Sequence, residues 1–245
     1  MSLLANLTSD ESIANEKDSV GGGGVLESNI YPAKVTLAYV TKSGGGALGL
    51  VVSAKTTEGH DIKQTLWMTY GMEKGCKNYY EKDGQKNYLP GYLAANALAL
   101  LTTGKEISGL ETETKVVNVY NSDAKAEVPT KVEMVMDLLG KEILIGLIKQ
   151  TVNKTKKDDV TGVYLPTGET RDENEIDKFF RASDRKTTAE IRAQVEEAKF
   201  ADTWLEKWQG KVKDKTSKTA ATGAPGAPRA AAPAAAKKPA TSLFA

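Results

Sequence analysis

The chain has 245 residues and a formal net charge of +1, and its hydrophobic (40%) and charged (27%) fractions suit one globular domain with extensions. Nothing in it approaches the roughly 20 consecutive apolar residues of a membrane-spanning helix, and its first 19 residues carry acids where a signal peptide has a basic region, so we expect a cytosolic protein without membrane contact. A single cysteine, Cys76, and a single histidine, His60, exclude an internal disulfide and a Cys/His metal cluster, and no metal or other cofactor is expected.

The chain begins with a polar, acidic segment. Residues 1–29 include Gly21–Gly24, a run that no regular element tolerates, so we expect a flexible acidic N-terminal arm. After residue 30, runs of β-branched and aromatic residues alternate with clusters of turn residues. This pattern predicts a meander of three strands, over residues 35–41, 47–54 and 61–70.

A helix and further strands are expected after the meander. A loop over residues 71–89 leads to the alanine- and leucine-rich stretch 90–101, which favours a helix because Pro90 suits its first turn and Gly104 its end. The isoleucine-rich stretch that follows Gly140 is so apolar that it must be a buried strand or helix, and its composition favours a strand. The later strands are predicted over residues 115–120, 132–136 and 142–152.

The order of these elements predicts the fold class. It is a mainly β fold with helices, in the α+β class. Three strands, a helix and then a closing pair is the order of the OB-fold, a five-stranded, partly open Greek-key barrel that often binds oligonucleotides. We therefore expect an OB-like core over residues 30–166, whose last part, residues 153–166, forms a basic hairpin or loop.

The C-terminal third divides into two parts. Residues 167–210 combine a charged segment with an amphipathic helix over 188–210, whose aromatic stripe we expect to pack on the barrel or on a second subunit. Residues 211–245 are rich in alanine, proline and lysine and cannot bury enough apolar area to offset their conformational entropy, so a disordered tail is predicted. The tail ends in Ser-Leu-Phe-Ala, a short apolar sequence suited to capturing a partner.

The loop over residues 71–89 combines two chemistries that hold a single nucleic-acid strand whatever its sequence. Lysine ammonium groups can follow the phosphates, and tyrosine rings offer flat faces on which any base can stack. A second patch is expected on the last core strand and its hairpin. The candidate nucleic-acid-binding residues are Trp67, Tyr70, Lys74, Lys77, Tyr79, Tyr80, Lys82, Lys86 and Tyr88 in the first patch, and Lys149, Lys154, Lys156, Lys157 and Tyr164 in the second. The alternative for any one tyrosine is that it caps the core.

The distribution of charge supports this interpretation. The formal charge is −4 over residues 1–30, +4 over 31–157, −5 over 158–210 and +6 over 211–245. A basic middle between acidic pieces suits a core that binds a polyanion, although uneven solvated faces would give the same count. Arginine, the commonest reader of guanine in duplex DNA, is absent from residues 31–157. Lysine without arginine favours contact with phosphates over the reading of base pairs.

Enzymatic chemistry is not expected. A Ser-His-Asp triad would need His60, which lies in the turn-like sequence EGHD and is better explained as an exposed turn residue. The glycine run at 21–24 is not followed by the Lys-Ser/Thr of a phosphate-binding loop and does not lie between a strand and a helix. We therefore predict no catalytic residues.

Four segments resemble a known family. They are NYLPGYLAANALALLTTGKE at 87–106, DLLGKEILIGLIKQ at 137–150, GETRDENEIDKFF at 168–180 and KKPATSLFA at 237–245. They resemble the single-stranded DNA-binding proteins of tailed bacteriophages, particularly those of N4-like podoviruses. The resemblance implies an OB-like core, roles in phage DNA replication and recombination in the cytoplasm of the infected host, and in some members a role with host RNA polymerase. This tail departs from many single-strand binders, because it is basic rather than acidic before its terminal aromatic.

Two functions remain open from the sequence. The first is sequence-independent binding of single-stranded DNA, which would protect and organise it during phage replication and recombination, with self-association on the DNA. The second is regulation of transcription by binding host RNA polymerase. A tail contact with polymerase or with phage replication and recombination proteins would use Lys237, Lys238, Leu243 and Phe244. A basic tail could also touch DNA.

Overall fold

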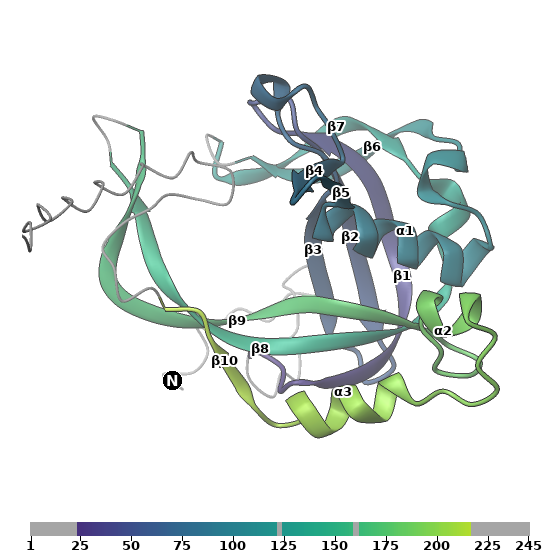
Figure 1. Cartoon of the computed structure of the whole chain (residues 1–245). Coiled ribbons are helices and arrows are strands. Elements are labelled where there is room, and N and C mark those ends of the chain that lie inside the picture. The colour runs from purple at the N-terminus through teal and green to yellow at the C-terminus, as the bar shows by residue number, and fades with distance from the viewer. Residues whose placement is uncertain (1–23, 122–123, 159–161, 217–245) are drawn as a thin grey trace, which may run out of the picture.

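A computed structural model describes residues 24–121, 124–158 and 162–216. Within them the protein is mainly antiparallel β with a few short helices, which confirms the predicted α+β class (Figure 1). None of the helices in the described part is long and apolar enough to cross a membrane.

The predicted three-stranded meander is present. It consists of β1 (Asn29–Lys42), β2 (Leu48–Thr56) and β3 (Asp61–Trp67), each antiparallel to the next. The third strand ends at Trp67, three residues earlier than predicted. Residues of β2 and β3 alternate between faces, so that Leu50 and Leu66 are buried on the core side while Lys63 and Trp67 are exposed on the other.

Strand β1 joins the two halves of the main sheet. One of its edges pairs with β2, and the other pairs first with β8 (Glu142–Lys157) and then, at Tyr39 and Val40, with β7 (Ala126–Met134). Strand β7 forms a hairpin with β6 (Glu113–Asn121), and β8 forms a long hairpin with β9 (Tyr164–Arg181). The short strand β10 (Val212–Asp214) pairs in parallel with β8 beyond the end of β1.

The expected five-stranded barrel is not found in this form. The main sheet has eight strands, and no ladder in the described part of the chain joins β3 to β9, so the barrel does not close. The extra strands of the main sheet are β6, β7 and β10: β7 pairs with β1 and with β6, and β10 pairs with β8. Register shifts at Thr36 and Asp177 each leave one residue unpaired, a feature that bends strands.

Helix α1 (Pro90–Thr103) lies where it was predicted. Pro90 is in its first turn, and Gly104, with φ of 76°, ends it in the left-handed conformation. Its buried residues pack into the main core, which is built from β1, β2, β3, α1, β8 and β9 and includes Leu50, Leu98, Ile145 and Phe179. Short 3-10 turns lie at Met72–Lys74, Ile107–Gly109 and Met136–Leu138.

The single amphipathic helix predicted over 188–210 is wrong in its extent. The structure has two helices, α2 (Thr188–Arg192) and α3 (Phe200–Trp208). Helix α3 lies on the outer face of the β8–β9 sheet, where its buried Trp204 packs with Ile148 and Phe180 (Figure 1). The expected packing of the aromatic stripe on the body of the protein is therefore confirmed for Trp204.

Candidate nucleic-acid interface

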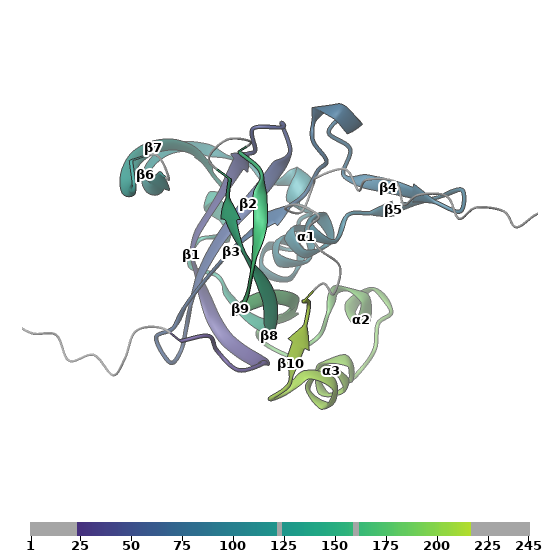
Figure 2. The same cartoon turned by 90° about the vertical axis from the view of Figure 1, so that its left-hand side faces the viewer.

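The predicted loop over residues 71–89 contains a hairpin that sequence analysis missed. Strands β4 (Tyr79–Lys82) and β5 (Gln85–Tyr88) form a separate two-stranded sheet, which stands away from the body of the protein (Figure 2). Asp83 and Gly84 turn the chain with positive φ angles of 52° and 74°, as a two-residue hairpin loop requires. The Asp83-Gly84 pair between two tyrosine-containing runs is the sequence signal that could have predicted this hairpin.

Close backbone contacts fix the base of this hairpin to the β1–β2 turn. The Met72 amide donates to the Gly45 carbonyl over 2.8 Å, and a Cβ at Gly71 would lie 2.6 Å from the same oxygen. The Tyr70 amide donates to the Lys77 carbonyl, and the Leu89 amide donates to the Asn78 carbonyl, both over 2.9 Å. The hairpin is therefore held at both of its ends, with glycine required where the two loops meet.

Lysines of the hairpin and of the segment that precedes it lie over nearby tyrosine rings. The distance from ammonium to ring centroid is 4.6 Å for Lys74 and Tyr70, 5.6 Å for Lys77 and Tyr79, and 4.9 Å for Lys86 and Tyr79. All of these residues except Lys86 border an open depression of about 580 Å³, which Tyr80 and the carboxylates Glu73 and Glu81 also line. Among the described residues, none of Lys74, Lys77, Lys82 and Lys86 forms an ion pair with a carboxylate. Their charges are therefore available to an anionic ligand.

The pleat of the hairpin divides its aromatic residues between two faces. Tyr79 lies directly opposite Tyr88, so these two share one face, whereas Tyr80 lies on the other. The Tyr88 ring also lies 4.8 Å from the ring of Tyr92 on α1, and burial raises the pKa of Tyr92. The three tyrosines predicted as one platform thus form two surfaces, and sequence analysis missed Tyr92 because the contact spans a strand and a helix.

Trp67 lies on the outer face of β3 with 41% of its surface exposed. A Cβ on the facing residue Gly49 would lie 2.9 Å from the indole Cε3, so glycine at this position lets the ring lie close to β2. Lys63 is exposed on the same face of β3, because it lies four residues before Trp67. Sequence analysis missed Lys63, although the alternation of residues along the strand was sufficient to find it.

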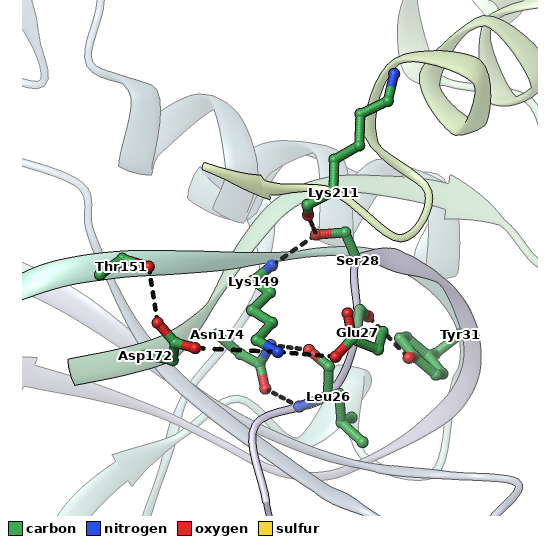
Figure 3. Close-up of polar contacts among 9 residues, drawn as sticks. All are labelled: Leu26, Glu27, Ser28, Tyr31, Lys149, Thr151, Asp172, Asn174 and Lys211. Atoms are coloured by element: carbon green, nitrogen blue, oxygen red, sulfur yellow. Dashed lines mark hydrogen bonds and ion pairs between the residues drawn. The ribbon is translucent and has the colours of Figure 1, made fainter. Parts of the chain in front are cut away.

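The residues of the second predicted patch do not form one open basic surface, because Lys149 forms ion pairs with carboxylates of the protein itself. Its ammonium lies 2.8 Å from Glu27 Oε1 and 3.9 Å from Asp172 Oδ2, and only 19% of its side chain is exposed (Figure 3). The hydrogen bond to Glu27 raises the pKa of Lys149. Thr151 in turn donates a hydrogen bond to Asp172. The structure therefore places Lys149 in an internal ion-pair network and not on an open basic surface.

This network anchors the end of the predicted N-terminal arm. Asn174 accepts a hydrogen bond from the Leu26 amide and donates one to the Leu26 carbonyl, both over 2.8 Å (Figure 3). The buried Ser28 hydroxyl accepts from the Lys149 amide and donates to the Lys211 carbonyl. Residues 26–28 are thus held against the sheet, whereas residues 1–23 of the expected flexible arm lie outside the described part.

The other residues of the second patch lie along the projecting β8–β9 hairpin (Figure 1). Lys154 forms an ion pair of 3.0 Å with Glu169. Lys156 and Lys157 are exposed, and within the described ranges neither has a carboxylate partner. Tyr164 lies directly opposite Lys157 and is 48% exposed. These three residues remain an accessible patch, separate in the chain from the β4–β5 hairpin.

The remaining predicted features have simple outcomes. His60 is exposed in the turn between β2 and β3, 3.7 Å from Glu58. The predicted tail contacts, Lys237, Lys238, Leu243 and Phe244, lie outside the described residues. No group of three or more His, Cys, Asp and Glu side chains within the described ranges is arranged to hold a metal ion.

The sequence matches no protein-family model, and no curated protein is significantly similar to it.

Proposed function

We propose that this protein binds single-stranded DNA without regard to sequence, and that the β4–β5 hairpin is the main contact. The observation that carries the proposal is a set of four lysines, two on the hairpin and two just before it, which lie among tyrosines and form no ion pair with a carboxylate in the described part of the chain. A single strand would supply phosphates for these lysines and flat bases that stack on the tyrosine rings. No catalytic role is proposed.

The physical chemistry favours a single strand over a duplex. In an unpaired strand the base faces are open, and stacking on an aromatic side chain is worth about 1–3 kcal/mol per base. Tyr80, Tyr88 and Trp67 expose 38%, 53% and 41% of their surfaces. Three such contacts, together with lysine–phosphate contacts, are sufficient for micromolar affinity, which corresponds to about −8 kcal/mol. In a duplex the base faces are covered, so the stacking contribution is lost.

The arrangement of the core strands supports an OB-like architecture without a closed barrel. Strands β1, β2 and β3, helix α1 and then strands β8 and β9 follow the OB-fold order, with β1 paired to both β2 and β8. In this proposal β4–β5 and β6–β7 are insertions into the basic plan. The exposed face of β3 that carries Lys63 and Trp67 would then extend the binding surface from the hairpin.

The resemblance of four segments to the single-stranded DNA-binding proteins of tailed phages agrees with this proposal. On that basis we place the protein in phage DNA replication and recombination, in the cytoplasm of the infected host cell. Its proposed tasks are to protect single strands and to organise them for copying or exchange.

The test is binding of a fluorescently labelled oligo-dT, measured by anisotropy at several salt concentrations. We expect tight binding to the single strand and much weaker binding to a duplex of equal length. Replacing Tyr79, Tyr80 and Tyr88 together with alanine should weaken oligo-dT binding by at least tenfold, whereas Y120A, which removes an exposed tyrosine from β6, should not. Equal affinity for duplex and single strand would reject the proposal.

A further inference from the structure

Tyr79 already has cations over its ring. Lys77 and Lys86 place their ammonium groups 5.6 and 4.9 Å from its centroid, and the side chain is half-buried. Lys86 is a diagonal cross-strand neighbour of Tyr79, and Lys77 precedes it by two residues, so both ammonium groups approach from neighbouring backbone positions. The face of an aromatic ring carries partial negative charge and attracts cations. The Tyr79 ring therefore favours side-chain conformations of Lys77 and Lys86 that keep their two ammonium groups close together.

Tyr88, directly opposite, has a different environment. Its surface is 53% exposed, and no lysine or arginine of the described residues lies over its ring. Instead, the ring of Tyr92 lies 4.8 Å away at an interplanar angle of 34°, and Tyr92 belongs to the first turns of α1. An exposed ring supported by a helix residue is a ready platform for a base.

We infer that these two facing tyrosines have different roles: Tyr79 is a positioning residue that holds the Lys77 and Lys86 ammonium groups for phosphate binding, whereas Tyr88, supported by Tyr92, stacks on a base. This inference rests on the proposed single-strand binding. Tyr79 would position the charged lysines and Tyr88 would provide the stacking surface, although both residues are tyrosines on one face of the same hairpin.

The two roles have separable signatures. Phosphate contacts release counterions, so each one lost reduces the slope of log affinity against log salt by about 0.7 for a single strand. Stacking involves no net charge, so its loss lowers affinity by the same factor at every salt concentration and leaves the slope unchanged.

The experiment uses the full chain and oligo-dT anisotropy over a range of potassium chloride concentrations. Y79L should reduce the slope by about 0.7 to 1.4, for one or two phosphate contacts, and Y79F, which keeps the ring, should restore the wild-type slope. Y88L should keep the slope and weaken binding about 5- to 150-fold at every salt concentration, the equivalent of one stacked base. Y88F should bind like the wild type. Y120L, at an exposed tyrosine on β6, is the matched control and should change neither quantity.

A second variant tests the same role without altering the ring. K77M/K86M should reproduce the slope of Y79L, and adding Y79L to it should reduce the slope no further. A Y79L variant that loses affinity at unchanged slope, or a Y79F variant that fails to restore the slope, would overturn the inference and leave single-strand binding intact. Wild-type protein that does not prefer oligo-dT to duplex would instead remove the proposed function, and the inference with it.

Discussion

The backbone amide of Ile176 on β9 donates a hydrogen bond to the side-chain oxygen Oε1 of Gln64 on β3, over 2.6 Å. The two residues are 112 positions apart in the chain and lie on strands that no ladder joins. Ile176 is buried at the bulge beside Asp177. Without Gln64 its amide would be unpaired and shielded from water. One side chain therefore substitutes for backbone pairing where an OB-like barrel would close.

Replacing Gln64 should weaken this junction. Q64L removes the acceptor and leaves the buried Ile176 amide unpaired, so we expect the free energy of unfolding to fall by about 1–3 kcal/mol. Chemical denaturation measures this change. Q64E is the matched control, because it keeps an oxygen acceptor at the same position and should lie closer to the wild type at neutral pH. Equal losses in the two variants would mean that the hydrogen bond does not matter.

Gly49 should control the position of Trp67. A Cβ at this position would lie 2.8 Å from Thr65 Cγ2 and 2.9 Å from Trp67 Cε3, so G49A must displace the indole ring or β3 itself. We expect G49A to lower stability and to weaken oligo-dT binding severalfold. G44A is the control, because a Cβ at Gly44 meets nothing within 4 Å. Unchanged DNA affinity in a folded G49A protein would exclude Trp67 from the binding surface.

Lys149 and Lys77 should respond differently to loss of their charge. Lys149 is paired with Glu27 and Asp172 inside the network that holds the N-terminal segment, whereas Lys77 lies over Tyr79 in the open hairpin. K149M should therefore lower the thermal unfolding midpoint and leave the salt slope of DNA binding nearly unchanged. K77M should do the opposite and reduce the slope by about 0.7. If K149M reduces the salt slope as much as K77M does, Lys149 belongs to the DNA-binding site.

The attachment of β10 should depend on pH through Glu175. Burial of this carboxyl raises its pKa, but the ion pairs with Lys215 and Lys213 together lower the pKa by more than burial raises it. The pKa of Glu175 therefore lies below the ordinary value. A lowered pKa in the folded state stabilises the fold above the unfolded pKa of about 4.3, and this contribution is lost as the pH falls through the folded pKa. We expect the amides of β10 to lose protection from hydrogen exchange in acid.

At neutral pH the variant E175Q should reproduce this loss, since both lysines then lack a carboxylate. E206Q, on the exposed side of α3, serves as the control. If acid and E175Q both leave the protection of Val212–Asp214 unchanged, the backbone pairing with β8 is sufficient to hold β10.

The elements predicted correctly from the sequence are those whose determinants are local. Runs of β-branched residues between turn sequences gave the positions of β1, β2 and β3, because alternation and turn chemistry act over a few residues, although β1 begins at Asn29, six residues before its predicted start. Pro90 and Gly104 set the limits of α1 for the same reason. The lysine and tyrosine content of the hairpin was also evident, since composition does not depend on folding.

The tertiary structure decided what depends on distant partners. Residues 193–198 are mostly good helix formers, yet the chain leaves the helix there because Glu190 accepts hydrogen bonds from the Thr187, Lys199 and Phe200 amides and so ties α2 to the start of α3. In the same way Lys149 is basic in the sequence but neutralised by Glu27, 122 residues away. A single sequence carries local preference and composition, whereas pairing between remote segments is settled when the whole chain packs, which is why the eight-stranded sheet and the ion pair of Lys149 appeared only in the folded protein.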